Sequence, residues 1–386
     1  MVFVTHSYPR FIGDAAGSFL LTLAQALTAR DIHVEVVAPA SKDLAPYEAL
    51  GGVPVHRFRY APRAWETLAY TGTMAESVTG TVSGKVALLG YLLAQANATR
   101  KLVRRLAAPI VHAHWWFPGA LSAGMLVRRP TRIIVTLHGS DVRLAARTAW
   151  APGLFREVVR QVSAVTAVSG WLAQQARAMA PKAEPIVAPM PVDTTMFAPP
   201  TLDVRRQGEV LFVGRLNAQK GLHLLLAALQ SVRHLDRLHV VGEGPDGAAL
   251  RRQADSLGLA DRITWHGALA RESLVALYQR ATAVAIPSLD EGLGLVAVEA
   301  QLCETPVVAF ASGGLPDVVH DGATGVLAPA GDVRALAAGL DKILGSSELA
   351  ITLGRNGRRR ALETFSPDAA AARYVDVYRR VLNRAA

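Results

Sequence analysis

Short apolar runs alternate with amphipathic stretches along the first half of the chain. Residues 2–5 form a β-branched and aromatic run, residues 18–30 repeat apolar side chains at helical spacing, and residues 34–38 form a second apolar run. A strand, a helix and a strand in this order predict a βαβ unit, which requires a parallel sheet. Further units are predicted by strands at 110–113, 133–137 and 164–168 and by helices at 152–162 and from 170 onward.

The same alternation restarts after a proline-dense segment. Residues 188–203 contain four prolines, which between periodic stretches is typical of an interdomain linker. Beyond it we predict strands at 209–213, 238–241, 263–266, 283–287 and 307–309, and helices at 221–229, 248–257, 273–280, 295–303 and 367–382. The pattern therefore predicts an α/β protein with two Rossmann-like, doubly wound parallel-sheet domains, at 1–195 and 204–366.

The composition excludes several classes of protein. Hydrophobic residues make up 51% of the 386, which suits a folded core and not a disordered chain. A single cysteine, Cys303, excludes a disulfide scaffold and a multi-cysteine zinc site. No apolar run reaches the roughly 18–20 residues of a transmembrane helix, and the first residues do not resemble a signal peptide. We therefore expect a cytoplasmic protein.

The positive charge is concentrated in the first half of the chain. Residues 1–199 hold 20 Lys and Arg against 11 Asp and Glu, a net charge of +9, whereas residues 200–386 hold 21 against 20. This excess favours an anionic partner, such as a phospholipid surface or a phosphorylated acceptor, over ordinary solvated surface. Nucleic acid is not expected as a partner, because no zinc-finger spacing, basic homeodomain-like helix or aromatic RNA-binding motif is present.

A cluster of basic residues ends an apolar stretch that begins near Trp65. The cluster consists of Arg100, Lys101, Arg104 and Arg105. A basic amphipathic helix is typical of an anionic membrane surface, but a core helix with a solvated basic end has the same pattern. Both interpretations stay open, and with them peripheral attachment to the inner face of a membrane.

A glycine-flanked loop with two cations follows the strand predicted at 209–213. It reads Gly214-Arg215-Leu216-Asn217-Ala218-Gln219-Lys220-Gly221 and opens a helix. Glycines let a backbone approach a ligand, and a helix N-terminus favours an anion. Arg215 offers a planar fork and Lys220 a point charge, which together suit a diphosphate. A surface loop with two solvated cations is the competing interpretation.

A second loop combines glycines with two carboxylates. Residues 287–300 read P-S-L-D-E-G-L-G-L-V-A-V-E-A, with Glu291 before a helix that begins near Gly294 and Glu299 in its second turn. The apolar neighbours of Glu299 favour burial, and a buried carboxylate needs a partner, such as a hydroxyl-rich ligand. The amides of residues 292–295 offer a phosphate site at the helix N-terminus. Alternatively, Glu299 faces solvent and Glu291 is a loop acid.

Together the two loops resemble the signature of the family-4 retaining glycosyltransferases (glycosyl transferases group 1), which have the GT-B fold. The family pattern is a G-R-L…K-G loop followed by E-G-F/L-G-L…E with seven residues between the acids, which is the spacing of Glu291 and Glu299. The resemblance continues through T-P-V-V-A, G-G-L-P-D and D-G-A-T-G at 305–325. In the first half it is looser and rests on H-A-H-W and L-H-G-S-D at 112–141.

The resemblance implies roles for individual residues. Arg215 and Lys220 would bind the nucleotide diphosphate. Glu299 would hold the ribose, and Glu291 would sit at the donor sugar. His138 would face the reaction centre, and with Arg215, Lys220 and Glu291 it forms the expected catalytic set.

The resemblance also implies a wider donor site, an acceptor side and a domain arrangement. The remaining donor-site residues would be Gly17, Gly214, Gly242, Leu269, Gly292, Leu293, Gly294 and Leu295. The acceptor side would include Asp14, His114 and Asp141. Domain 1–195 would bind the acceptor and domain 204–366 the nucleotide sugar, facing each other across a cleft. Helix 367–386 would pack back on the N-terminal domain.

These expectations define a retaining hexosyltransferase that forms an α-linkage. It would move a hexose from a UDP- or GDP-sugar to a hydroxyl of a lipid-linked, phosphorylated or glycan acceptor. No cofactor or metal is expected, because the nucleotide half lacks an Asp-x-Asp motif and His112, His114 and His138 have no fixed ligand spacing. The G-x-G-x-x-G match at 242–247 is a poor dinucleotide motif, since Pro245 removes an amide donor. A sugar-nucleotide epimerase, a phosphorylase and a non-catalytic binding module are the alternatives.

Overall fold

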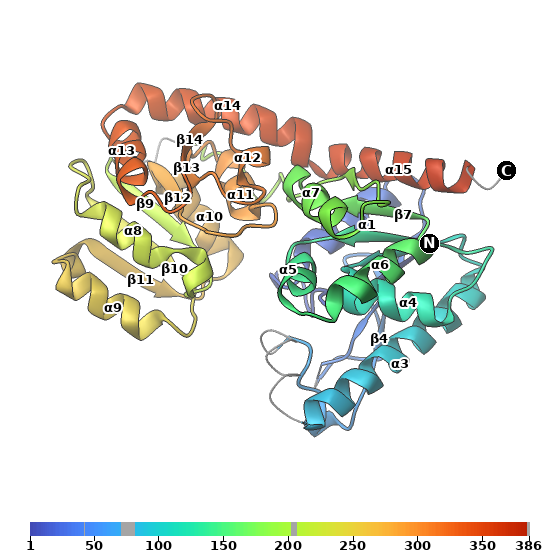
Figure 1. Cartoon of the computed structure of the whole chain (residues 1–386). Coiled ribbons are helices and arrows are strands. Elements are labelled where there is room, and N and C mark those ends of the chain that lie inside the picture. The colour runs from blue at the N-terminus through green and yellow to red at the C-terminus, as the bar shows by residue number, and fades with distance from the viewer. Residues whose placement is uncertain (42, 71–81, 202–206, 384–386) are drawn as a thin grey trace. The chain divides into compact units, whose positions relative to one another are not determined.

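The computed structural model describes residues 1–41, 43–70, 82–201 and 207–383, and the chain divides into two compact units. The first unit comprises residues 1–191 and 370–386, and the second comprises residues 192–369. Each is a sheet flanked by helices (Figure 1). Parts of the linker predicted at 188–203 and of the helix predicted at 367–386 lie outside the described residues.

Among the described residues, eight strands form the sheet of the first unit, in the order β3-β4-β2-β1-β5-β6-β7-β8. They are β1 (Val2–Val4), β2 (Glu35–Pro39), β3 (Tyr47–Leu50), β4 (Val53–Phe58), β5 (Ile110–His114), β6 (Arg132–Leu137), β7 (Ala164–Ala167) and β8 (Ile186–Val187). Neighbouring strands are parallel except for the β3–β4 hairpin. Gly51 and Gly52 join this hairpin, and both have the positive φ that its two-residue turn requires.

Helices cover both faces of this sheet. They are α1 (Ser18–Thr28), α3 (Val82–Leu106), α4 (Leu121–Leu126), α5 (Ser140–Arg147), α6 (Ala151–Gln161), α7 (Gly170–Met179) and α15 (Pro367–Asn383), with short turns η1 (Arg63–Trp65) and η2 (Trp116–Ala120). Two buried tyrosines anchor α15 on the first unit. The Tyr378 hydroxyl lies 2.8 Å from Nδ1 of His112, and the Tyr374 hydroxyl donates to the Ala188 carbonyl at 2.8 Å.

The described strands of the second unit form a six-stranded, all-parallel sheet in the order β11-β10-β9-β12-β13-β14. They are β9 (Glu209–Val213), β10 (Arg237–Val241), β11 (Ile263–Gly267), β12 (Ala283–Ile286), β13 (Val307–Phe310) and β14 (Gly325–Ala328). The helices are α8 (Leu222–Leu229), α9 (Gly247–Ser256), α10 (Arg271–Arg280), α11 (Leu295–Leu302), α12 (Leu315–Val318), α13 (Val333–Leu344) and α14 (Ser347–Phe365), with turns η3 (Ala218–Lys220) and η4 (Ala260–Arg262).

Alternate strand residues fill the core of the second unit. Phe212, Val240 and Phe310 are buried with the apolar faces of α8 and α13 in one cluster. Burial of these side chains supplies most of the driving force for folding the unit. The two parallel-sheet units confirm the predicted fold class. No helix of the described part of the chain is both long and apolar enough to cross a membrane.

Candidate active site

The second unit brings the two predicted loops to neighbouring strands. Strands β9 and β12 pair with each other, although the chain passes through β10 and β11 between them. In open α/β sheets, ligands bind at the carboxyl ends of the strands where the strand order reverses in this way. The loop 214–221 leaves β9 and the loop 287–294 leaves β12, so both lie at this point of the sheet.

Three contacts tie these loops to each other. Nζ of Lys220 lies 2.6 Å from Oε2 of Glu291. The Gln219 side-chain amide donates to the Asp290 carbonyl at 2.6 Å, and the Leu289 amide donates to the Gln219 carbonyl at 2.9 Å. The two halves of the motif, 71 residues apart in sequence, therefore form one site.

Glycines permit the close approach of these loops. A Cβ at Gly221, where φ is +71°, would lie 1.9 Å from the Pro287 carbonyl oxygen. A Cβ at Gly242 would lie 2.0 Å from the Gly214 carbonyl oxygen, so the turn after β10 also packs on the loop after β9. Gly242, the first glycine of the 242–247 match, thus has a packing role. Leu269 follows β11 and is half-buried.

The two cations of the first loop differ in their surroundings. The Asn217 side chain accepts a hydrogen bond from the Lys220 amide at 3.1 Å, which fixes the turn that carries the lysine. The Lys220 side chain is engaged by Glu291, whereas the exposed guanidinium of Arg215 forms no hydrogen bond or ion pair with any residue that the structure describes. The loop therefore presents one engaged cation and one free cation.

The second loop leads directly into helix α11. Gly294 precedes the helix with φ +95°, and the Glu291 carbonyl accepts the Gly314 amide at 2.8 Å. Gly292 and Leu293 are buried, and Leu295 is half-buried at the first position of α11. The first amides of a helix have no intrahelical acceptor and carry partial positive charge. Glu291 is thus held just before an N-terminus that suits an anion.

Glu299 is half-buried on α11 and has a protein partner. The Tyr278 hydroxyl of α10 donates to its Oε2 at 2.8 Å. Burial raises the pKa of Glu299 to about 7, against the hydrogen bond from Tyr278 and the charge of Arg271, which lower it. The carboxyl therefore holds its proton at a higher pH than an ordinary glutamate does.

The first unit gathers histidines where its own strand order reverses, between β1 and β5. His6 follows β1, His114 ends β5 and His138 follows β6. Nδ1 of His114 lies 3.2 Å from Nε2 of His138, and the Trp115 ring stacks on His138 with centroids 4.2 Å apart. Burial lowers the pKa of His6 to about 4 and those of His114 and His138 well below their usual value. These imidazoles are therefore neutral at pH 7.

Asp141 holds the backbone beside His138. Its carboxylate is 3% exposed and accepts amide hydrogen bonds from His138 at 3.1 Å, Gly139 at 3.0 Å and Trp116 at 3.1 Å. Burial raises the pKa of Asp141, and these amides oppose that rise. Both oxygens are occupied by backbone groups, so Asp141 positions His138.

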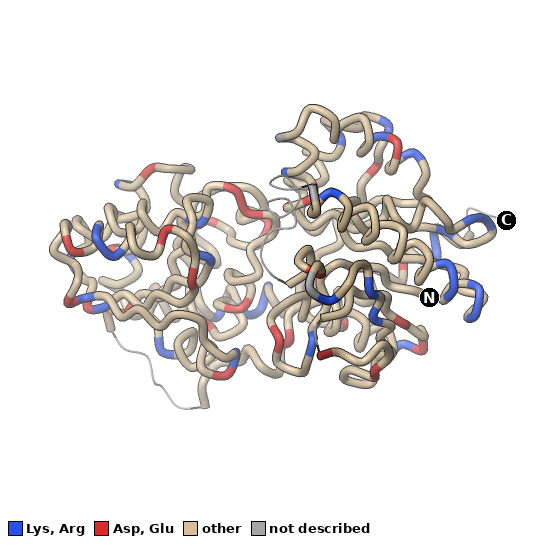
Figure 2. Tube along the Cα trace, turned by 90° about the horizontal axis from the view of Figure 1, so that it is seen from below, with Lys and Arg blue, Asp and Glu red and all other residues tan. Residues whose placement is uncertain are grey.

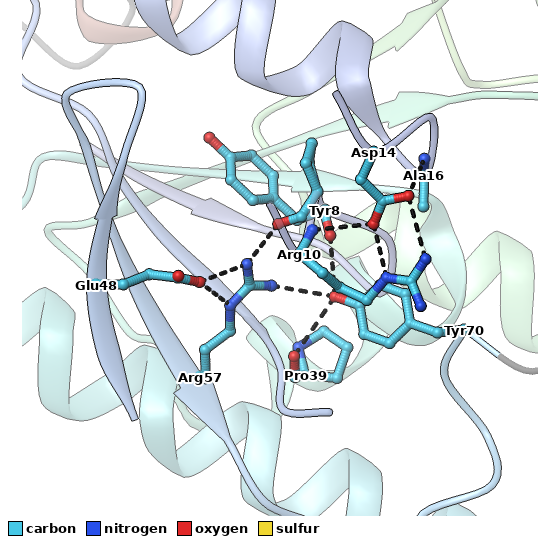
Figure 3. A network of polar contacts seen from close by, with 9 residues as sticks. Tyr8, Arg10, Asp14, Ala16, Pro39, Glu48, Arg57 and Tyr70 are labelled. Carbon is cyan, nitrogen blue, oxygen red and sulfur yellow. Dashed lines mark hydrogen bonds and ion pairs between the residues drawn. The ribbon is translucent and has the colours of Figure 1, made fainter. Parts of the chain in front are cut away.

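A polar network holds the first loop of the chain, as Figure 3 shows. Oδ2 of Asp14 lies 2.6 Å from Nε of Arg10, and Oδ1 accepts the Ala16 amide at 3.2 Å. Burial alone would raise the pKa of Asp14, but the hydrogen bonds from Arg10 and the backbone outweigh it and lower the pKa. Arg57 of β4 is buried, pairs with Glu48 at 2.7 Å and donates to the loop backbone.

Gly17 ends this loop and begins α1 with φ +69°. A Cβ there would lie 2.4 Å from the Ser7 carbonyl oxygen, so the close crossing of the two segments requires glycine. Gly17, Asp14 and the histidines all belong to the first unit, whereas Arg215, Lys220 and the two glutamates belong to the second. Each unit thus brings together its own share of the predicted residues, whose roles toward a ligand stay predictions.

Sequence reasoning missed two side chains of these sites. His6 follows the first strand at the reversal of the sheet, a position that was open to prediction. Tyr278, the partner of Glu299, lies on a different helix and had no sequence signal. Within the described ranges, no group of three or more His, Cys, Asp or Glu side chains is placed to hold a metal ion.

Comparison with known proteins identifies the class. Residues 200–360 match the family model described as glycosyl transferases group 1, and residues 16–196 match that of glycosyltransferase family 4. Sucrose-phosphate synthase from Thermosynechococcus elongatus has a similar structure, with a TM-score of 0.82, 24% identity and coverage of 99% of both chains. The fold is thus that of the GT-B glycosyltransferases.

Curated relatives extend along nearly the whole chain. A D-inositol 3-phosphate glycosyltransferase from Xylanimonas cellulosilytica is 31% identical over 96% of this chain and 93% of its own length. A GDP-mannose-dependent alpha-(1-6)-phosphatidylinositol monomannoside mannosyltransferase from Mycolicibacterium smegmatis is 31% identical over 74% of this chain and 81% of its own length. The chain belongs to glycosyltransferase family 4 and is a glycosyltransferase.

Proposed function

We propose that this enzyme transfers a hexose from a nucleoside-diphosphate sugar to a hydroxyl group, with retention of configuration and without a metal ion. The observation that carries the proposal is the contact of Lys220 with Glu291 where β9 and β12 adjoin. This contact joins a cation of the first loop to a carboxylate that lies just before the N-terminus of α11, and a departing diphosphate and its sugar require groups of these kinds.

Charge on the leaving diphosphate is the main electrostatic demand of the reaction. Arg215 supplies a free guanidinium, and Lys220 supplies an amine that exchanges Glu291 for a phosphate oxygen when the donor binds. The first amides of α11 add their partial charge. These groups stabilise the transition state without a metal, because the charge that develops is already faced by fixed positive groups.

The two glutamates have different assigned roles, Glu299 in donor binding and Glu291 in turnover. Glu299 accepts a hydrogen bond from Tyr278 on one oxygen, and we assign its other oxygen to the ribose hydroxyls. Glu291, released from Lys220, is assigned to the donor sugar. On the first unit, the neutral His138 has its Nε2 beside His114, so Nδ1 is the atom that we assign to a substrate hydroxyl.

A phosphorylated or lipid-linked acceptor fits the charge of the chain. The relatives named above act on an inositol 3-phosphate and on a phosphatidylinositol monomannoside, as their names state. The first 199 residues carry a net charge of +9, which attracts an anionic acceptor to the unit that would bind it. UDP- and GDP-hexoses are the donors to test first.

Helix α3 presents an exposed apolar stripe that suits a membrane surface. Val86, Leu89 and Leu93 are 58%, 58% and 48% exposed and are spaced three and four residues apart. This spacing puts them on one face of the helix. Apolar side chains in such a stripe insert at the boundary between headgroups and acyl chains.

The basic end of α3 continues the same stripe. Arg100, Lys101 and Arg104 follow at helical spacing, and none of them pairs with a described residue. Arg105, the fourth member of the predicted cluster, is instead 2.6 Å from Glu35. We therefore assign peripheral attachment to an anionic membrane to three free cations and the apolar stripe beside them.

Mass spectrometry of reaction products tests the proposed function. UDP- and GDP-hexoses are combined with inositol phosphates, phosphatidylinositol-type lipids and glycans. The wild type is expected to form a glycoside, and Arg215→Gln/Lys220→Gln is expected to lose it, with Lys342→Gln on the exposed face of α13 as the control. A free-sugar isomer, or a reaction that depends on inorganic phosphate, would instead identify an epimerase or a phosphorylase.

A further inference from the structure

Two adjoining cavities open on the first unit at the edge where its strands begin. Their volumes are about 620 and 680 Å³, and both are lined by Val162, Ser163 and Val381. The first lies at the start of β6 and β7, and the second extends to the start of β8. We call the two together the basic groove.

Positive charge dominates the walls of the basic groove. Its basic lining residues are Arg128, Arg129, Arg132, Arg160, Arg177, Lys182 and Arg380, and its acidic lining residue is Glu184. Figure 2 shows Lys and Arg gathered near both termini, and Val381, close to the C-terminus, lines both cavities. Much of the excess positive charge of the first half of the chain therefore lies around the basic groove.

The protein itself neutralises little of this charge. Arg160 pairs with Glu157 at 2.6 Å, and Arg128 donates to carbonyls at the end of α4. The side chains of the five remaining cations form no hydrogen bond or ion pair with any residue that the structure describes. Like charges gathered without counter-charges repel one another, and a bound anion removes this cost.

The floor of the groove is apolar. Ile133 is 7% exposed, and Val381 is 5% exposed. Arginine forks above such a floor bind phosphate oxygens in a bidentate manner, at a site with less competing water than an open surface. The lining therefore suits a phosphate group, alone or joined to an apolar part.

The groove is separate from the candidate active site. It lies at the start of β6, whereas His138 follows the end of that strand. At about 3.3 Å per residue, the length of β6 puts roughly 16 Å between them. A ligand in the groove therefore does not occupy the place assigned to donor or acceptor.

We propose that the basic groove is a second anion site, which binds a phosphate-bearing ligand, either a free phosphate compound or a lipid headgroup. Arg129 and Arg132 are its central groups, since both line the first cavity and neither guanidinium has a hydrogen-bond or ion-pair partner among the described residues. A site of this kind lets a phosphorylated metabolite or lipid bind the enzyme without competing for the reaction centre.

Isothermal titration calorimetry tests the groove with two soluble probes, inorganic pyrophosphate and dihexanoyl phosphatidic acid below its micelle concentration. Pyrophosphate is expected to fill two sites, the groove and the diphosphate site. Arg129→Gln/Arg132→Gln should weaken the first by about tenfold or more, and Arg215→Gln/Lys220→Gln should remove the second. Arg156→Gln, exposed on α6 and outside the lining, is the control.

A second variant guards against misfolding. Arg177→Gln/Arg380→Gln changes exposed helix positions of the neighbouring cavity and should also weaken binding, with the circular dichroism melting curve of the wild type retained. Phosphatidic acid bound more tightly than pyrophosphate at the groove identifies a lipid headgroup, and the reverse identifies a free phosphate compound. The proposal is overturned if neither probe binds less tightly to the groove variants than to Arg156→Gln.

Discussion

Replacing Lys220 by alanine should weaken the binding of a nucleoside diphosphate by about 1.5–3 kcal/mol, the usual contribution of a hydrogen bond to a charged group. In the structure the same amine lies 2.6 Å from Glu291, with the two side chains 23% and 16% exposed. A partly exposed ion pair of this kind contributes about 0.2–1 kcal/mol. The diphosphate has to displace Glu291 from the Lys220 amine. The free energy of that ion pair therefore reduces the favourable free energy of diphosphate binding in the wild type.

Glu291→Gln therefore provides a sharper test than the lysine variant alone. It removes the competitor for Lys220, so nucleoside-diphosphate affinity should stay the same or rise, by about fivefold at most for 1 kcal/mol. The transfer rate should fall, because the charge assigned to the donor sugar is lost. Calorimetry with UDP and GDP measures binding, turnover is measured on the same preparations, and Lys342→Ala is the control. Equal loss of affinity in Lys220→Ala and Glu291→Gln would refute this reasoning.

Three further predictions follow from the structure. Glu299→Gln should weaken nucleotide binding more than it slows transfer at saturating donor. Because burial raises the pKa of Glu299 from 4.5 to about 7, the free energy of unfolding of the wild type should fall by up to about 3 kcal/mol as the pH rises from 4.5 to about 7. Denaturant titrations should show this fall in the wild type and not in the variant. Transfer should persist in EDTA, and activity that collapses there and returns with manganese would contradict a metal-independent site. The wild type should co-sediment with anionic vesicles at low salt, and the variant Arg100→Gln/Lys101→Gln/Arg104→Gln should not, since each cation near the surface contributes roughly 1 kcal/mol. Equal binding to zwitterionic vesicles would count against the attachment.

Local sequence patterns were enough to place the predicted loops in the fold. Arg215 and Glu291 each follow an apolar run, and the carboxyl end of a parallel strand is where such a loop must emerge. The pairing of Lys220 with Glu291 was not open to prediction, because it depends on β9 and β12 being neighbours in the sheet. Tyr278 was missed for the same reason, since only tertiary packing brings α10 against Glu299.

Elements without a clear period were missed. The β3–β4 hairpin has exposed and half-buried residues in β3 and a proline at position 54, so its strands lack a clean alternation, although the Gly51-Gly52 pair is a hairpin signal. Helices α13 and α14 were missed as well, although Asp332 and Ser346, which cap their N-termini, are recognisable helix-start residues. The basic groove was also missed, since Arg128, Arg129 and Arg132 are close in sequence but meet Arg160, Arg177, Lys182 and Arg380 only where parallel strands begin.

The anomeric configuration of the product tests the central claim most directly. The wild type is incubated with the donor and acceptor that give a glycoside, and the coupling of the anomeric proton is read by nuclear magnetic resonance, with Arg215→Gln/Lys220→Gln in parallel. The account predicts an α-linked hexose formed with retention by the wild type and no product from the double variant. A β-linked product, or transfer that continues unchanged without both cations, would contradict it.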